Sequence, residues 1–264
     1  MPSLRFELRR IRNISWLQRV LATFAFLCLI GAERPAFADD EALARSIVEK
    51  ADLVRFPAGG FEVTVAIANT APGREQEKRR YKVLSKGNEN TVVMVTEPAS
   101  DRGQIMLMRG RDLWVFLPNV SQPVRVPLSQ RLTGQVANGD LARANFAGDY
   151  TPRLLRTEQV DGEPVHVLEL LANDRAVTYH RILYWVKQAN FFPQRAEFYS
   201  VSDRLLKTAH YQNYAKMGGR LRPSRLVLQD ALRDGEESTL DYSELRARDL
   251  PDKIFTKDYL KRLE

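Results

Sequence analysis

The sequence predicts a mainly β protein in which one long antiparallel meander curls into a barrel or a half-barrel. One observation carries this prediction. Short apolar strands alternate with tight turns, such as Asp161-Gly162 and Gly218-Gly219, along most of the chain, and a sheet with so many strands must curl. The only cysteine, Cys28, lies near the N-terminus. The rest of the chain therefore has no disulfide or cysteine metal site and depends on its apolar core.

Residues 1–38 have the pattern of a cleaved secretory signal peptide. Arginines precede the uncharged run 20–30, and Ala36-Phe37-Ala38 supplies the small residues of a cleavage site. The run is too short for a transmembrane anchor, which needs about 20 apolar residues. We expect cleavage after Ala38 and a single periplasmic domain over 39–264. Because residues 1–38 hold six of the 40 basic residues and two of the 33 acidic ones, the expected mature chain is only weakly basic, which disfavours a nucleic-acid partner.

The elements expected after the signal are one helix, a long series of strands and a helical tail. Apolar residues at helical spacing predict an amphipathic helix over 41–54, which Pro57 and Gly59-Gly60 end. Alternation and turn residues predict strands at 61–67, 79–85, 91–96, 104–108, 113–117, 124–127, 165–171, 178–186, 194–199, 205–214, 222–229 and 237–242. Residues 253–263 return to helical spacing.

The hairpin from Gly103 to Pro118 is apolar at odd and at even positions. A strand with one face in water should alternate, so both faces of this hairpin must be covered. Protein could cover one face, and an apolar ligand could occupy the other. We therefore expect one face of this region to form a cavity wall. Alternation along the strands assigns five residues to that face, which are Met94, Met106, Met108, Trp114 and Phe116.

Residues 128–155 break the strand pattern with scattered glycines and Pro152. This segment is either a poorly ordered connector or one or two short helices that lie across the mouth of the sheet as a lid. The apolar side chains that a lid would turn toward the sheet are Leu132, Val136, Leu141 and Phe146.

The sequence contains no motif that carries catalysis. His166, His180 and His210 each lie in a predicted strand without close metal-ligand spacing. We also find no nucleophile elbow, zinc-protease motif or phosphate-binding glycine loop. We therefore predict no catalytic residues, no metal site, no cofactor and no enzymatic activity.

Several segments occur in an order that is typical of one family. They are the glycine-led strand 103–107, the segment Trp114-Val115-Phe116-Leu117-Pro118, the segment Val124-Arg125-Val126-Pro127, and later Tyr184-Trp185-Val186 and Gly219-Arg220-Leu221-Arg222-Pro223. This order resembles the outer-membrane lipoprotein-sorting family, the LolA-like periplasmic carriers. The resemblance covers nearly all of residues 39–264. It departs at Asn138-Gly139-Asp140-Leu141, where many relatives have a glycine-serine-aspartate-phenylalanine stretch.

The resemblance implies an incomplete, half-closed antiparallel barrel with helices covering its concave, apolar side. It also implies a periplasmic carrier that shelters acyl chains of lipoproteins or free lipids and moves them toward the outer membrane. The implied partners are an inner-membrane lipid exporter or release complex, with transient membrane contact only. Two alternatives stay open, which are a lipid- or lipoprotein-sensing interaction module on the same scaffold and an envelope hydrolase with a dispersed triad.

Overall fold

A computed structural model describes residues 36–260 apart from 88, 119 and 144. Residues Glu41–Glu264 form one compact unit, and the fold presented here is that of this unit. The predicted signal peptide lies outside the described residues except for 36–38, so its cleavage stays a prediction. Helix α2 (Ala36–Arg55) runs through the expected cleavage point.

The described residues form one long antiparallel sheet and a separate hairpin. The 13 strands of the sheet follow the order β6-β5-β4-β3-β2-β1-β15-β14-β13-β12-β11-β10-β9, and β7 pairs only with β8. The strands are β1 (Phe61–Thr70), β2 (Glu77–Lys86), β3 (Asn90–Glu97), β4 (Ile105–Arg109), β5 (Asp112–Phe116), β6 (Val124–Val126), β7 (Arg131–Thr133), β8 (Val136–Ala137), β9 (Tyr150–Val160), β10 (Glu163–Ala172), β11 (Arg181–Lys187), β12 (Pro193–Tyr199), β13 (Leu205–Met217), β14 (Arg220–Asp230) and β15 (Glu237–Ala247). The helices besides α2 are α3 (Asn138–Ala142), α4 (Phe146–Asp149), α5 (Lys257–Leu260) and the 3₁₀ turns η1 (Ala99–Asp101) and η2 (Asp252–Phe255).

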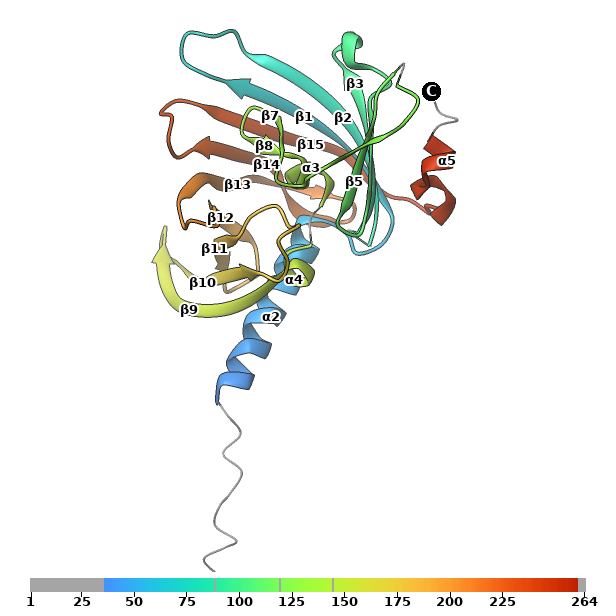
Figure 1. The fold of residues 1–264 in the computed structure, drawn as a ribbon. Coiled ribbons are helices and arrows are strands. Elements are labelled where there is room, and N and C mark those ends of the chain that lie inside the picture. Colours follow the sequence, from blue (N-terminus) through green and yellow to red (C-terminus); the bar gives the residue numbers. More distant parts are fainter. Residues whose placement is uncertain (1–35, 88, 119, 144, 261–264) are drawn as a thin grey trace, which may run out of the picture. The chain divides into compact units, whose positions relative to one another are not determined.

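The sheet curls without closing, since β6 and β9 each have one strand neighbour. Figure 1 shows the strands wrapping around α3, α4 and one end of α2. The predicted incomplete antiparallel barrel with helices on its concave side is confirmed. Tight turns join most sequential strands, and every neighbouring pair in the sheet is antiparallel.

Helix α2 packs against the concave side of the sheet. Ala44, Ile47, Val48 and Ala51 recur at helical spacing and are at most 1% exposed. Arg222 of β14 donates to the carbonyl oxygens of residues 53 and 54 at 2.7 and 2.9 Å, which satisfies the free carbonyls at the end of the helix. In the part of the chain that the structure describes, no helix is long and apolar enough to cross a membrane.

The two faces of the β3–β5 region belong to different apolar cores. The concave face contributes Met106 and Met108 to the large core beneath α2 and α3. The convex face contributes Leu107 and Phe116 to a smaller core, which the C-terminal tail of η2 and α5 covers with Phe255 and other apolar side chains. Protein therefore covers both faces of the hairpin that lacks a polar side.

Two expectations about the secondary-structure elements need correction. Residues 150–155 belong to β9 and not to a lid, and β9 was missed because it is an edge strand that carries Pro152 and exposes much of its length. The tail forms a 3₁₀ turn, η2, and a short α-helix, α5, in place of one continuous helix. The predicted tail residues 261–263 lie outside the described residues.

Candidate functional site

A lid covers the concave face of the sheet. We define the lid as residues 128–149, of which all but 144 are described; it comprises the β7–β8 hairpin and helices α3 and α4. The lid hairpin makes no strand pairing with the main sheet. The lid is therefore held by side-chain contacts and isolated backbone hydrogen bonds, which can break without disrupting the sheet ladder.

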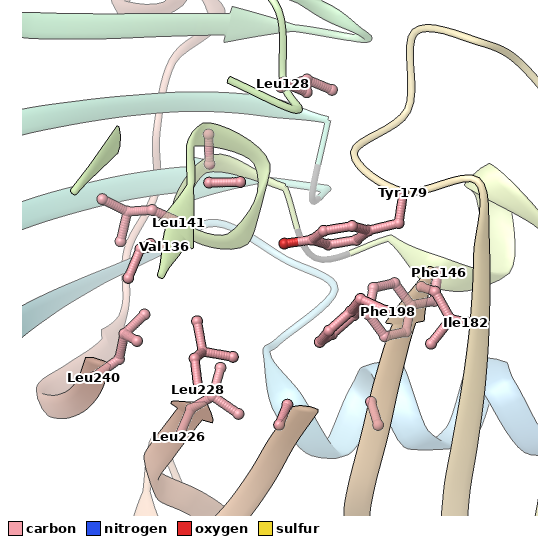
Figure 2. Close-up of a cluster of buried hydrophobic side chains, with 14 of the residues drawn as sticks. Leu128, Val136, Leu141, Phe146, Tyr179, Ile182, Phe198, Leu226, Leu228 and Leu240 are labelled. Carbon is pink, nitrogen blue, oxygen red and sulfur yellow. The ribbon is translucent and has the colours of Figure 1, made fainter. Parts of the chain in front are cut away.

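The apolar side chains of the lid point into the large core, as Figure 2 shows. Val136, Leu141 and Phe146 are 0%, 8% and 9% exposed, and Leu132 is partly buried against the same core. The sheet side chains in this core include Ile182, Phe198, Leu226, Leu228 and Leu240. The structure thus brings the four predicted lid residues to the concave side.

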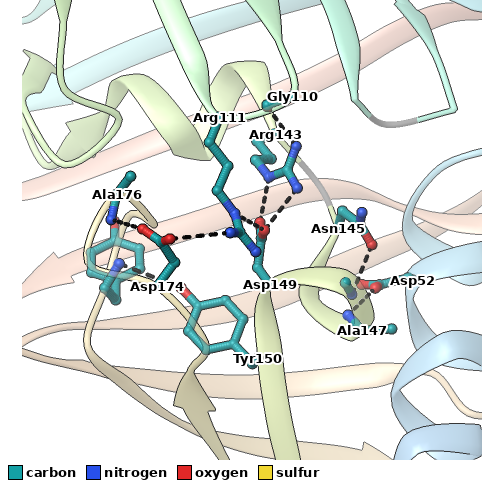
Figure 3. A network of polar contacts seen from close by, with 12 residues as sticks. Asp52, Gly110, Arg111, Arg143, Asn145, Ala147, Asp149, Tyr150, Asp174 and Ala176 are labelled. Atoms are coloured by element: carbon teal, nitrogen blue, oxygen red, sulfur yellow. Dashed lines mark hydrogen bonds and ion pairs between the residues drawn. The ribbon is translucent and has the colours of Figure 1, made fainter.

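A buried ion pair within the lid orders its end (Figure 3). Arg143 and Asp149 have side chains that are 5% and 6% exposed, and Arg143 Nη2 donates to Asp149 Oδ1 at 2.7 Å while its Nε donates to Oδ2. Arg143 Nη1 also donates to the Gly110 carbonyl at 2.7 Å. Arg111 Nε donates to Asp149 at 3.2 Å. These contacts tie the lid to the β4–β5 turn.

Helix α2 holds the same end of the lid from the other side. Asp52 Oδ2 accepts a hydrogen bond from the Ala147 backbone at 2.9 Å, and Arg45 donates to the Ala147 carbonyl at 3.0 Å. The Arg55 guanidinium lies 4.1 Å from the centroid of the Phe146 ring. Burial raises the pKa of the Asp52 carboxyl to about 6, and Arg55 offsets only part of that rise.

A second buried ion pair holds α3 to the sheet. Lys207 Nζ of β13 lies 2.6 Å from Asp140 Oδ2, with side chains 6% and 9% exposed. Asp140 also accepts from the Tyr179 hydroxyl at 2.8 Å and from the Ala137 backbone at 2.8 Å. Burial lowers the pKa of Lys207, and Asp140 counteracts that effect. The α3 carboxylate is therefore fully hydrogen-bonded, as a buried charge requires.

The tip of the lid hairpin rests on the ends of β1 and β15. Asn69 Nδ2 donates to Thr133 at 2.6 Å, and the Gln135 backbone donates to Ser238 Oγ at 2.8 Å. Gly134 has a φ of +49°, and a Cβ at this position would lie 2.1 Å from Asn69 Oδ1. Only glycine permits this approach of the hairpin to the sheet.

A small apolar cavity lies beneath the lid. The cavity between α3 and the inner faces of β1–β3 measures about 20 Å³, which is room for about one water molecule. Its lining is apolar for the most part and includes Phe61, Val83 and Leu141. With the lid in this position, the cavity has no room for a larger molecule.

The five predicted cavity-wall residues do not share one face. Met106 and Met108 lie on the concave side, whereas Met94, Trp114 and Phe116 lie on the convex side. The register explains the difference, because even-numbered residues pair with odd-numbered ones across β3, β4 and β5. Even positions of successive strands therefore alternate between faces, and assigning all five to one face was wrong. Their role in ligand binding stays a prediction.

The convex side has a hollow of its own beneath the tail. It measures about 370 Å³, and its lining includes Met94 from the sheet and Leu250, Ile254 and Tyr259 from the tail. This hollow is larger than the concave cavity of the closed lid. On the same side of the sheet, Lys257 Nζ lies 4.0 Å from the centroid of the Trp114 ring.

The three histidines lie apart from the lid and make no common site. His166 and His210 are in β10 and β13, and burial lowers the pKa of both. His180 lies just before β11. Within the described ranges, no group of three or more His, Cys, Asp or Glu side chains is placed to hold a metal ion.

Comparison with known proteins identifies the family. A family model described as an uncharacterized protein matches residues 87–262, and none of the curated proteins matches. A crystal structure of a LolA superfamily protein from Nitrosomonas europaea is 63% identical, with 82% of this chain and 98% of that chain covered and a TM-score of 0.79. The chain belongs to the LolA superfamily.

Two more distant structures share the fold of this LolA superfamily member. One is a DUF1329 family protein from Desulfovibrio piger, with 23% identity, 84% and 99% of the two chains covered and a TM-score of 0.71. The other is a putative outer membrane lipoprotein-sorting protein domain from Vibrio parahaemolyticus, with 22% identity, 84% and 100% covered and a TM-score of 0.70. The family resemblance predicted from the sequence is confirmed.

Sequence reasoning found the apolar residues of the lid and missed the polar ones. Asp52, Asp140, Arg143, Asp149 and Lys207 hold the lid, and each is at least nine-tenths buried or engaged in a buried pair. One signal was present in the sequence. Asp140, Arg143 and Asp149 are charged residues within a segment that was expected to cover an apolar face, and charges in such a place need partners.

Proposed function

We propose that this protein is a periplasmic carrier that binds acyl chains of lipoproteins or lipids beneath its lid and moves them toward the outer membrane. One observation carries the proposal. The apolar concave face is covered by a segment that is outside the main sheet and is held to it in part by polar contacts, among them the buried Lys207–Asp140 pair and the Arg143–Gly110 hydrogen bond. Such a segment can leave as a unit and expose apolar surface on the sheet and on itself.

The energetics of exchange support a carrier better than a permanent binding protein. An acyl chain that replaces lid contacts gains roughly 25 cal/mol per Å² of apolar surface removed from water. Opening the lid costs the contacts of Leu141 and Phe146 with the core and the Lys207–Asp140 ion pair. Because these terms oppose each other, cargo can be bound and later released without covalent chemistry.

The proposed location and partners follow from the signal-like N-terminus and the family. The superfamily structure with 63% identity and the lipoprotein-sorting domain with the same fold support a place in the periplasm. We propose an inner-membrane lipid exporter or release complex as the donor and transient contact with a membrane at delivery. Nucleic acid is not among the proposed partners.

A reversible lock on the lid tests whether cargo enters beneath it. A Cβ at Gly139 of α3 would lie 3.0 Å from the Thr178 Cβ, close to the separation of about 3.5–4.5 Å in disulfides. In a Cys28→Ser background, we expect oxidised Gly139→Cys/Thr178→Cys protein to take up a neutral fluorescent acyl ester at least tenfold more slowly than reduced protein. Equal uptake in both redox states contradicts entry beneath the lid.

Two further measurements complete this test. Thr178→Cys alone is the matched control, and its uptake should not respond to oxidation. Mass spectrometry of organic extracts from natively purified protein should find a lipid bound in near-stoichiometric amount. Absence of any co-purified lipid, together with no uptake of the ester by the reduced protein, contradicts the carrier function itself.

A further inference from the structure

A basic pocket lies beside the lid hairpin, outside the apolar core. It measures about 310 Å³ and is bounded by β7–β8, the start of β13 and the loop after β14. This volume falls at the lower end of the range of small-molecule sites. Four cationic side chains line it, which are Arg131, Arg204, Lys207 and Arg233, together with one carboxylate, Asp230.

Two of the four cations already have a carboxylate partner. Lys207 is paired with Asp140 at 2.6 Å, and Arg233 contacts Glu236 at 3.3 Å. Within the described residues, Arg131 and Arg204 make no ion pair. The pocket therefore has two exposed guanidinium groups that are available to an external anion.

The remaining carboxylate in the pocket is engaged with the backbone. Asp230 Oδ1 accepts hydrogen bonds from the backbone nitrogens of Leu232 and Arg233 at 2.7 and 3.0 Å, so it shapes the loop after β14. The charge of Arg131 also acts on the buried Lys207 and lowers its pKa further. An anion placed among these groups would relieve that repulsion.

Apolar side chains border the same pocket. Leu232 is 58% exposed on the loop after β14, Leu206 is partly buried, and Val136 belongs both to the pocket lining and to the core beneath the lid. Val136 therefore separates the basic pocket from the space that an acyl chain would enter. A molecule with an anionic head and apolar chains matches this arrangement.

We propose that the pocket binds a phosphate-type anion through the guanidinium groups of Arg131 and Arg204. Guanidinium forks bind phosphate oxygens with paired hydrogen bonds. The source of the anion is the headgroup of an anionic lipid whose chains lie beneath the lid. This assignment of the source rests on the proposed carrier function. Free inorganic phosphate is the other source with the same chemistry.

Three probes distinguish these sources. They are inorganic phosphate, soluble dihexanoyl phosphatidylglycerol and neutral dihexanoylglycerol, which has the same chains without the anion. We expect wild-type protein to bind the phosphatidylglycerol at least tenfold more tightly than the neutral lipid, measured by calorimetry. The Arg131→Gln/Arg204→Gln variant should reduce that ratio to less than threefold. Phosphate should compete with the anionic lipid in the wild type.

A second double variant controls for the change in net charge that the Arg131→Gln/Arg204→Gln variant causes. Arg153→Gln/Arg220→Gln removes two exposed arginines elsewhere on the sheet, in β9 and at the far end of β14, and should keep the wild-type ratio. If this control loses the preference equally, nonspecific charge explains it and the pocket proposal is wrong. Binding of phosphate at the pocket without any preference for the anionic lipid excludes the headgroup source.

The outcome is separable from that of the carrier proposal. Uptake of the neutral acyl ester should be the same in wild type and Arg131→Gln/Arg204→Gln protein, because the ester has no anion. Ester uptake with no effect of phosphate or of the arginine substitutions overturns the anion site alone. Phosphate binding that depends on the two arginines, in a protein that takes up no ester, overturns the carrier function alone.

Discussion

The two faces of the β3–β5 region are both apolar and both covered, but the covers are held differently. The lid lies over the concave face, where the buried Lys207–Asp140 pair and the Arg143–Gly110 hydrogen bond add to its apolar contacts. The tail lies over the convex face, where Phe255 and its neighbours form a compact apolar core. The polar contacts of the lid can be released by a competing partner, whereas the apolar core beneath the tail is lost only by local unfolding.

The largest effect is expected from the convex cover. Phe255 is 2% exposed, so Phe255→Ala should lower the free energy of unfolding by about 3–5 kcal/mol, measured in urea. Uptake of the neutral acyl ester by the folded protein should be unchanged. Val201→Ala, at a position 82% exposed, is the control and should change stability by less than about 0.5 kcal/mol. Loss of ester uptake in folded Phe255→Ala protein would place the cargo in the convex hollow.

The second prediction concerns the concave cover. Arg143→Met leaves the buried Asp149 with Arg111 as its remaining cation, and breaking a buried pair costs about 3–5 kcal/mol. We expect lower stability together with ester uptake that is roughly tenfold faster, measured by stopped-flow fluorescence. Arg125→Met is the matched control, because the Arg125–Asp112 pair is 68% and 44% exposed and contributes less than about 1 kcal/mol. Slower uptake in Arg143→Met protein would contradict the release of the lid.

The third prediction uses pH. The pKa of Asp52 is raised to about 6 from an ordinary value of 3.8, so the folded state favours the protonated carboxyl. The stability that this group contributes is fully present below about pH 4 and is lost as the pH rises through 6. Relative to Asp52→Asn, wild-type stability should therefore fall by up to about 3 kcal/mol between pH 4 and pH 7. Parallel stability curves for the two proteins would contradict the buried environment of Asp52.

The smallest effect is expected at the edge of the convex cover. Lys257 lies over the Trp114 ring, and Lys257→Gln should cost about 0.5–1 kcal/mol. Tryptophan fluorescence of the folded protein should change, since the charge next to this indole is lost, while ester uptake stays at the wild-type rate. An altered uptake rate would mean that the tail and the lid are coupled.

The sequence predicted the fold better than the site. Helix 41–54 and most strands follow from apolar periodicity, which burial on one face imposes on both kinds of element. Edge strand β9 was not predicted, because Pro152 and the many exposed positions of the strand obscure its apolar alternation. The sequence pattern did not predict which face of the sheet each methionine occupies. That face depends on the register set by the turns, which pairs odd with even residues across neighbouring strands. The Lys207–Asp140 pair joins residues far apart in the chain. The charge of Asp140 within the lid indicates that a partner is needed, but no local pattern shows which residue it is.

The burial of the ion pairs of the lid also determines how the closed state responds to salt. Mobile ions screen exposed charges over a Debye length of about 8 Å at physiological ionic strength and act much less on buried pairs. The Arg143–Asp149 and Lys207–Asp140 side chains are at most 9% exposed. Swings in osmolarity or ionic composition should therefore leave the lid closed. Opening would then depend on a molecule that makes specific contacts with the lid.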